Sequence, residues 1–366
     1  MSPDRFTEVE SMGQFRKWKR RGVGCGAGVV VLMGIFLSGS SACASPWDPA
    51  SRAASRPAVH RGSPPPGLRG VFYWKTDWSR SSIDLSELRS GGPPRDGIPP
   101  IDHPEFEKRA EDSRWSDEPV IVLELNGDAR AYPLRILLWH EMVNDVVGGV
   151  PVTVTFCPLC HSAIVFDRRV GDRVLSFGVS GLLRKSDMVM WDRQTESLWQ
   201  QFTGRGIVGE MTGVQLRIIP SRIISRGEFV RKYPRGKVLA PPSEVLRPYG
   251  RNPYVNYAEK DRKPFLYRGR IDNRYAPMER VTGIIRGDDV RVYPMSRVAR
   301  EGRIVDVVGG ETVVLTYHPN VLSVLDKRNI RDSRRDGSVE VTDEQGNPVP
   351  HLDTFWFAWQ AFHPER

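Results

Sequence analysis

Two cysteines separated by two residues, Cys157 and Cys160, are the side chains of this 366-residue chain best suited to chemistry. They lie in the run Thr155-Phe156-Cys157-Pro158-Leu159-Cys160-His161. Cysteine pairs at this spacing are usually metal ligands or redox couples, because neighbouring thiolates share a soft cation or exchange a disulfide. A purely structural disulfide is a weaker explanation, since closing so small a ring contributes only about 2 kcal/mol.

A metal site is the first interpretation of this run. Cys157 and Cys160 would supply two thiolates, and His140 and His161 are the nearest candidate imidazole ligands in the sequence. Thiolate together with imidazole suits copper or zinc. Residues expected to orient these ligands, or to lie beside them, are Glu141, Asn144, Asp145, Asp192 and His318. Asp187 and Arg193 are further candidates for the rim of the cysteine pocket, although a turn between core strands is the favoured explanation of that segment.

Two other interpretations use the same cysteines. In a thiol–disulfide oxidoreductase the first thiol would attack and the second would resolve the mixed disulfide. The stretch Ser162 to Phe166 weakens this interpretation, because its pattern is typical of a strand, whereas exchange sites place a helix there that lowers the thiol pKa. A scaffold or binding module with an inert disulfide is the third interpretation, so the sequence leaves open whether the protein is an enzyme. The run also fits the c-type haem pattern, but its strand-like surroundings disfavour haem.

The elements around the cysteines are predicted to be mainly strands. Val152–Phe156 and Ala163–Asp167 form a hairpin whose loop carries both cysteines, and Val120–Leu125 is an earlier strand. Pro133 opens a helix whose apolar face is formed by Leu134, Leu137, Leu138 and Met142. Further strands are expected at 174–179, 198–202 and 216–219, a short helix at 227–233, and a buried strand at 355–362.

The sequence repeats itself with a constant offset of 161 residues. Eleven of the 29 residues from Arg130 to Pro158 are identical to those at the shifted positions, including the run Asp145–Gly149. A looser similarity relates 199–202 to 359–362. We therefore expect a strand-rich α+β fold of two homologous halves packed as one globular body. In the second half, His318 replaces Cys157 and Val321 replaces Cys160.

The N-terminal region is predicted to be a targeting segment followed by a tether. A basic stretch, an apolar run and the small residues Ala42-Cys43-Ala44 are typical of a signal peptide or an N-terminal anchor. The predicted organisation is 1–44 leader or anchor, 45–70 disordered tether rich in Pro, Ser and Arg, 71–118 N-terminal extension, 119–203 first half, 204–280 connecting insert and 281–363 second half. This organisation predicts an extracytoplasmic protein that contacts the membrane only through an uncleaved or lipidated N-terminus.

The charge argues against nucleic acid as a partner. The net charge is +9, but residues 1–44 contribute +3 and residues 45–70 another +3. The remaining +3 is spread over 296 residues, with no Lys/Arg stripe interleaved with aromatics. The expected partner is a metal ion or an unidentified small molecule.

Four segments together carry a resemblance to a known family. They are the helix end Trp139–Asp145, the run Thr155–Cys160, the stretch Asp192–Trp199 and the C-terminal Trp356–Pro364. In this combination the chain resembles the family called domain of unknown function 3179, over about Pro119 to Pro364. The resemblance implies an exported protein without an established activity, and it supports the importance of the cysteine loop.

Overall fold

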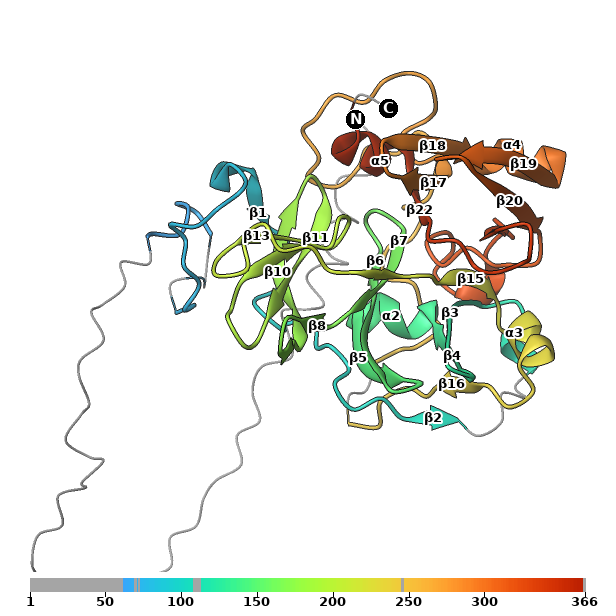
Figure 1. Ribbon diagram of the computed structural model, residues 1–366, viewed down its shortest axis with the longest axis horizontal. Helices are drawn as coiled ribbons and strands as arrows, with labels where there is room; N and C mark the ends of the chain where they lie inside the picture. Colours follow the sequence, from blue (N-terminus) through green and yellow to red (C-terminus); the bar gives the residue numbers. More distant parts are fainter. Residues whose placement is uncertain (1–61, 69–70, 72, 108–112, 245–246, 365–366) are drawn as a thin grey trace, which may run out of the picture. The chain divides into compact units, whose positions relative to one another are not determined.

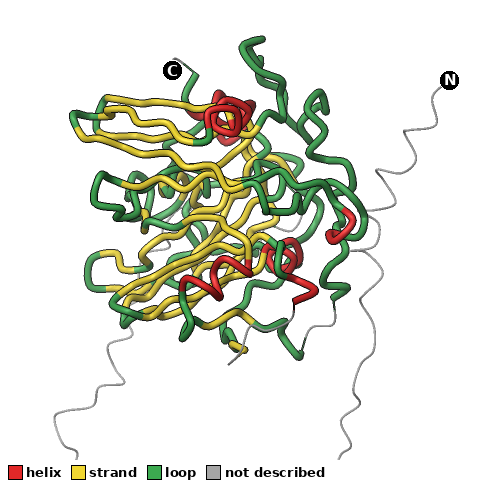
Figure 2. The backbone as a smooth tube through the Cα atoms, turned by 90° about the vertical axis from the view of Figure 1, so that its right-hand side faces the viewer, coloured by secondary structure: helices red, strands yellow, loops and turns green. Residues whose placement is uncertain are grey.

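Strands dominate the structure, a computed structural model that describes residues 62–68, 71, 73–107, 113–244 and 247–364. About 40% of the residues are in strands and 12% in helices. The prediction of a strand-rich protein with few helices is confirmed (Figure 2), and this composition is compatible with the α+β class. The described residues belong to one compact unit. The predicted leader and most of the predicted tether lie outside the described residues. No helix of the described ranges is long and apolar enough to cross a membrane.

The cysteines belong to a group of elements that follows the N-terminal extension (Figure 1). In chain order these elements are β3 (Pro119–Leu125), β4 (Asp128–Pro133), α2 (Leu134–His140), β5 (Met142–Val147), β6 (Val150–Cys157) and β7 (Ser162–Asp167). Strands β5, β6 and β7 pair antiparallel, with β14 (Ile218–Ile219) on the β7 edge. A second sheet has the order β15-β3-β4-β16-β2, with β15 at Arg222–Ser225, β16 at Lys237–Leu239 and β2 at Phe106–Glu107. The segment expected to be an insert therefore supplies strands to both sheets.

A third sheet lies beside these two and has the order β1-β10-β11-β12-β13. Its strands are β1 (Leu88–Ser90), β10 (Phe177–Arg184), β11 (Asp187–Asp192), β12 (Leu198–Gln200) and β13 (Arg205–Val208). The short hairpin β8 (Arg169–Val170) and β9 (Arg173–Val174) precedes β10, and α3 (Arg226–Lys232) follows β15. Single turns of 3-10 helix are η4 (Leu85–Glu87), η5 (Ser113–Trp115) and η6 (Ile330–Asp332).

The C-terminal region repeats the order of elements found around the cysteines. It comprises β17 (Arg280–Arg286), β18 (Asp289–Pro294), α4 (Met295–Glu301), β19 (Arg303–Val308), β20 (Glu311–His318), β21 (Ser338–Thr342), β22 (Leu352–Phe355) and α5 (Trp356–Phe362). The first five of these begin and end 161 residues after β3, β4, α2, β5 and β6. Individual hydrogen bonds recur as well. The hydroxyl of Tyr132 donates to Asp145 over 2.7 Å, and that of Tyr293 donates to Asp306 over 2.7 Å.

Two predictions of secondary structure are wrong, and one predicted similarity between the halves is not matched. The stretch 355–362 is mostly helix α5 rather than a strand, because a segment that is apolar on nearly all sides carries no period that separates the two. Met142 begins β5 instead of extending α2, since Glu141 adopts φ 57° and ends the helix. The similarity of 199–202 to 359–362 is not matched in structure, because Trp199 lies on strand β12 and Trp359 on helix α5.

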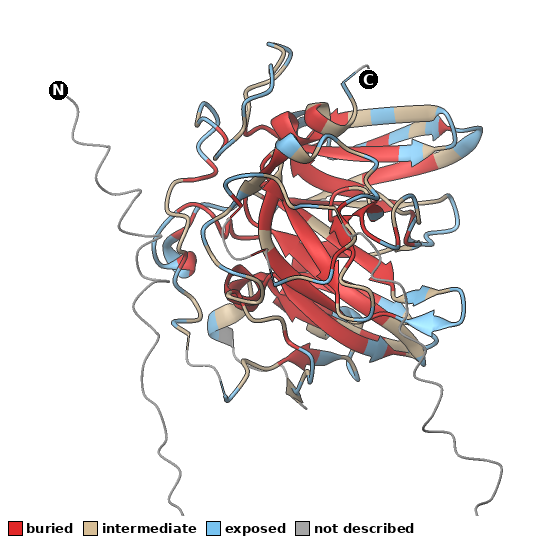
Figure 3. Cartoon of the chain, turned by 90° about the vertical axis from the view of Figure 1, so that its left-hand side faces the viewer, coloured by how far each residue is buried: buried red, intermediate tan, exposed pale blue. Residues whose placement is uncertain are grey.

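Burial is concentrated in the strands and in α2 and α5 (Figure 3). All seven residues of α2 are buried, so this short helix is held by packing on every side rather than by its own length. Leu68, from the end of the predicted tether, packs with Val71 and Trp78 in a cluster beneath β11 and β13. The strands that carry the cysteines are thus enclosed by neighbouring sheets.

Candidate metal centre

The two cysteines occupy the end of β6 and the turn that leads into β7. Cys157 is the last residue of β6 and pairs with Ser162, the first residue of β7. Both thiols are free, and the exposed fractions of the two residues are 1% and 0%. The turn is held from the C-terminal region, because the Phe355 amide and the Thr354 hydroxyl both donate to the Cys160 carbonyl oxygen, over 2.9 and 2.8 Å. The predicted hairpin is confirmed, and its loop is anchored by strand β22, which belongs to the sheet β18-β17-β22.

Asp187 brings a carboxylate to this pair from the β10–β11 hairpin. The two turn residues before it, Lys185 and Ser186, have φ values of 54° and 69°, as a tight hairpin turn requires. The carboxylate oxygen Oδ2 accepts hydrogen bonds from the Gln200 side-chain amide over 2.6 Å and from the Phe202 backbone N–H over 2.9 Å. The other oxygen, Oδ1, is buried, and no N–H or O–H group of the described residues donates to it.

These three side chains converge on one point. The Sγ atoms of Cys157 and Cys160 and a carboxylate oxygen of Asp187 all lie within 4.8 Å of one another. The Cys160 thiol also contacts the carbonyl oxygen of Ser186 over 3.5 Å, so the cysteine turn and the β10–β11 turn touch directly. Two thiols and a carboxylate form a donor set for a metal ion, with Asp187 Oδ1 as the oxygen that accepts from no N–H or O–H group of the described residues.

Electrostatics at this point disfavour negative charge on the protein. Burial raises the pKa of Asp187 to about 6, against the hydrogen bonds from Gln200 and Phe202. Burial also raises the pKa of both thiols, and each is raised further by nearby acids. Glu141, the residue that ends α2, has its pKa raised to about 8 by burial and by the charge of Asp187. Four acids are thus crowded together, and a bound cation would relieve their repulsion.

An irregular segment lies against the centre. The chain between β16 and β17 contains no helix or strand among its described residues, and segments this long without secondary structure are commonly functional. Tyr254 bonds to the Glu141 carboxyl, and Tyr257 lies close enough to both thiols for their charges to raise its pKa. The segment is fixed by Ser186, whose hydroxyl donates to the Phe265 carbonyl over 2.5 Å. These tyrosines had no signal in the sequence, because nothing local relates them to the cysteines.

The two predicted histidine ligands lie in other surroundings. His140 Nδ1 is 2.8 Å from the Pro99 carbonyl oxygen, and His140 Nε2 is 2.6 Å from the Tyr249 hydroxyl. A carbonyl only accepts, so Nδ1 carries the proton and Nε2 accepts from the tyrosine. Burial lowers the pKa of His140 to about 4, which keeps the ring neutral. Both ring nitrogens are therefore already bonded, and His140 does not belong to the ligand group.

His161 has the left-handed backbone conformation, with φ 53°, and its ring packs between Phe156 and Phe355. The ring is buried, its Nδ1 has no hydrogen-bond partner among the described residues, and burial keeps its pKa well below the usual value. His161 is not part of the ligand group either. Its position at the end of the turn fits a role in shaping the turn that holds Cys160.

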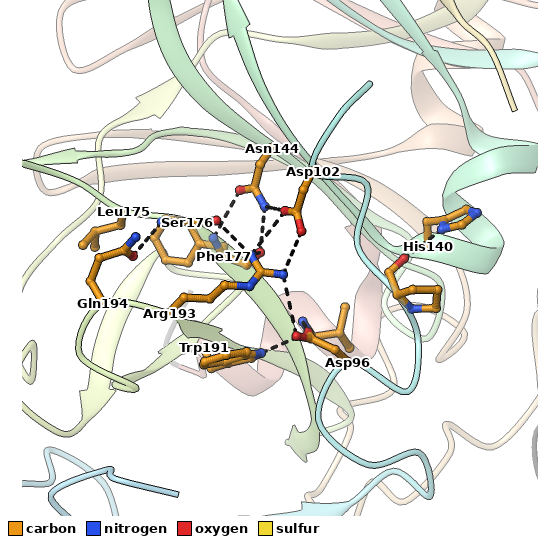
Figure 4. A network of polar contacts seen from close by, with 12 residues as sticks. Asp96, Asp102, His140, Asn144, Leu175, Ser176, Phe177, Trp191, Arg193 and Gln194 are labelled. Carbon is orange, nitrogen blue, oxygen red and sulfur yellow. Dashed lines mark hydrogen bonds and ion pairs between the residues drawn. The ribbon is translucent and has the colours of Figure 1, made fainter. Parts of the chain in front are cut away.

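The residues expected to orient the ligands take part in four separate networks. Asn144 donates to Asp102 and to the Phe177 carbonyl oxygen, each over 2.7 Å (Figure 4). Asp145 accepts from Arg130 and Tyr132, and Asp192 accepts from Thr195 and Trp199. His318 lies between Glu228 and Glu340, which raise its pKa to about 9. Of the predicted residues around the ligands, Glu141 is the one with an electrostatic link to the cysteines and Asp187.

Arg193 ties the N-terminal extension to the far end of β11. Its guanidinium lies 3.0 Å from Asp102 and 3.6 Å from Asp96, and it also donates to the Phe177 carbonyl oxygen over 2.9 Å (Figure 4). Trp191 donates to Asp96 over 3.1 Å. These bonds fix the end of β11, the strand that begins with Asp187. The N-terminal extension therefore supports the candidate metal centre indirectly, through β11.

The fold and this site define a class of strand-rich α+β protein with a buried dithiol and carboxylate between two hairpin turns. Residues 95–366 match the family described as protein of unknown function (DUF3179), and the chain belongs to this family. The match begins in the segment that Arg193 holds, so it includes part of the extension as well as the two predicted halves. Neither the comparison with curated proteins nor that with solved structures gave a match.

Proposed function

We propose that Cys157, Cys160 and Asp187 bind a metal ion. The observation that carries this proposal is the convergence of the three ligand atoms within 4.8 Å, in a place where Asp187 Oδ1 is buried without an N–H or O–H donor among the described residues. A buried carboxylate oxygen whose nearest donors are thiols, which are weak donors, is costly, and coordination would offset that cost. Metal binding would also release the thiol protons that burial otherwise retains.

Zinc fits this donor set better than copper(I). Zinc accepts thiolate and carboxylate ligands together, whereas copper(I) prefers sulfur alone. In a tetrahedral zinc site the two sulfurs would be about 3.8 Å apart for Zn–S bonds of about 2.3 Å. The ligand atoms lie within 4.8 Å, so a modest contraction suffices. Three protein ligands leave a fourth position for water or a substrate, and Glu141 is the neighbouring acid that would act on a molecule bound there.

Burial supports metal binding over thiol–disulfide exchange. An exchanging cysteine needs an accessible thiol with a lowered pKa, whereas both thiols here are enclosed and have raised pKa values. Strand β7 begins at Ser162, directly after the turn, so no helix N-terminus is aimed at Cys157. These two features weigh against the oxidoreductase interpretation.

We further infer that the two halves arose by duplication and that the first became the metal-binding one. The constant spacing of five elements and the recurring tyrosine–aspartate bond support a common origin. The position of Cys157 is taken by His318, which is bonded to two glutamates, and that of Glu141 by Gly302. Residues 1–44 fit an export signal, which would place the protein outside the cytoplasm, where a bound metal would protect the thiols from oxidation.

Metal analysis of the full chain tests the proposal. The protein would be purified anaerobically under reducing conditions, and its metal content measured by inductively coupled plasma mass spectrometry before and after incubation with zinc or copper(I). We expect close to one ion per chain, lost in the Cys157→Ser/Cys160→Ser variant. The matched control is Cys25→Ser/Cys43→Ser, which removes the other two of the four cysteines and should retain the ion. Protein that stays metal-free after both incubations would refute metal binding.

A further inference from the structure

A pocket of about 530 Å³ lies on the solvent side of the β10–β11 turn. Its wall is formed by Arg89 of β1, by Lys185 and Ser186 of the turn, by the stretch Leu266–Arg270 of the irregular segment and by the end of α5. Small-molecule sites typically enclose about 300–1,000 Å³, so this volume is in the range for a ligand of modest size. Residues from four distant parts of the chain thus enclose one cavity.

The wall of this pocket is strongly basic. Among the described residues, four cationic side chains line it, Arg89, Lys185, Arg268 and Arg270, against one acid, Glu87. The charge of Glu87 is already matched by Arg184, which lies 3.0 Å away and outside the lining. The pocket therefore presents an excess of positive charge that would attract an anion.

None of the four cations is neutralised by a carboxylate in the described part of the chain. The Arg89 guanidinium donates to the carbonyl oxygens of Ser86 and Leu88, and the Lys185 ammonium donates to that of Ala361 over 2.9 Å. These neutral acceptors fix the side chains without neutralising their charges. Arg268 and Arg270 are exposed and form no ion pair within the described ranges. Two positioned cations and two adaptable ones are suited to clamp a carboxylate or phosphate group.

The pocket and the candidate metal centre share one residue. Ser186 lines the pocket, its carbonyl oxygen contacts the Cys160 thiol over 3.5 Å, and the next residue is Asp187. A free metal cation would be repelled by the pocket wall, so the pocket is unsuited to be its binding site. A ligand in this pocket would therefore contact Ser186, the residue that directly precedes Asp187 of the candidate metal centre.

We infer that this pocket binds a small organic anion that carries carboxylate or phosphate groups. Arg268 and Arg270 supply the adaptable contacts, while Arg89 and Lys185 supply fixed positive charge. Binding at this place does not require the metal, because all four positive charges belong to side chains of the protein. The metal proposal can therefore fail while this one holds, and the reverse is also true.

Isothermal titration calorimetry of the full chain tests the inference with inorganic phosphate and with citrate as probes, at constant ionic strength. We expect saturable binding of at least one probe, and the preferred probe distinguishes a phosphorylated from a polycarboxylate ligand. The Arg268→Ala/Arg270→Ala variant should bind that probe about tenfold more weakly or worse. The Cys157→Ser/Cys160→Ser variant should bind it as the wild type does.

The matched control is Lys263→Ala/Arg274→Ala. It removes two positive charges from the same irregular segment, and neither residue lines the pocket. Its affinity for the probe should equal that of the wild type. The inference is overturned by the absence of saturable binding of both probes, or by an equal loss of affinity in the two double variants, which would show general attraction to a basic surface.

Discussion

Replacement of Asp187 by asparagine is the most informative single change, because it alters the ligand group and keeps its shape. The new amide oxygen can accept the hydrogen bonds that Oδ2 takes from Gln200 and Phe202, at 2.6 and 2.9 Å. The amide nitrogen would then point at the two thiols in place of Oδ1. A donor group cannot coordinate a cation, so the site keeps its packing and loses one anionic ligand.

The size of the effect follows from the number of ligands. Structural zinc sites with four ligands bind with about 10–16 kcal/mol, or roughly 3 kcal/mol per ligand. Losing one ligand should therefore weaken zinc binding roughly a hundredfold. The dissociation constant would be measured by competition with a chromophoric chelator, and cobalt(II) substitution would report the thiolate ligands by their charge-transfer absorption.

Asp192→Asn is the matched control for this experiment. Asp192 is equally buried and ends the same strand β11, where it accepts from Thr195 and Trp199 outside the ligand group. Its replacement should reduce stability and leave the zinc affinity unchanged within about twofold. Wild-type affinity in Asp187→Asn would refute the assignment of Asp187 as a ligand. An equal loss in both variants would show that the effect comes from β11 and not from the carboxylate.

Three further predictions concern the surroundings of the centre. Burial raises the pKa of Glu141 from 4.5 to about 8, so the stability that the protonated side chain contributes is complete below pH 4.5 and is lost as the pH rises through 8. Urea unfolding should therefore show that Glu141→Gln gains stability relative to the metal-free wild type across this pH range. A difference in stability that does not change with pH would contradict the burial of an ionisable acid. His140→Ala should lower the free energy of unfolding by about 1–3 kcal/mol through the loss of the Pro99 and Tyr249 bonds, with unchanged zinc affinity; a large loss of affinity would restore His140 as a ligand. Tyr132→Phe and Tyr293→Phe should each destabilise by about 1 kcal/mol, the former more because Asp145 is more buried than Asp306, and a negligible cost in both would deny the recurring bond a structural role.

Local sequence patterns predicted the elements around the cysteines well. The alternation of Val120–Leu125, the proline before α2 and the paired strands around the cysteine turn each depend on neighbouring residues, and all appear in the structure. The strand predicted at 174–179 is divided between β9 and β10, because residues 175 and 176 connect the two. The terminal helix α5 was missed because Trp356, Phe357 and Trp359 are all buried, and such a segment has no polar face that would reveal its period.

The site was harder to predict than the fold. The spacing of the two cysteines indicates a site, but the carboxylate that lies beside them belongs to Asp187, 27 residues after Cys160 on another hairpin. Proximity in the sequence favoured His140 and His161, whose rings instead bond to or pack against other residues. Only the packing of the sheets determines which turns meet. The sequence therefore indicates Asp187 only as one of several rim candidates, and it carries no signal for the tyrosines of the irregular segment.

The irregular segment between β16 and β17 covers the candidate metal centre, and this should affect the rate of metal exchange. Tyr254 and Tyr257 lie against the acids of the centre, and the Ser186–Phe265 bond fastens the segment over the turn. An ion in such a place leaves only when the segment opens, so its residence time depends on that local opening and not on affinity alone. Loading would then accompany folding, and a chelator would remove the ion slowly even from a site of modest affinity. Removing the Ser186–Phe265 hydrogen bond by Ser186→Ala should speed the release of the metal ion, while the dissociation constant of the metal changes much less.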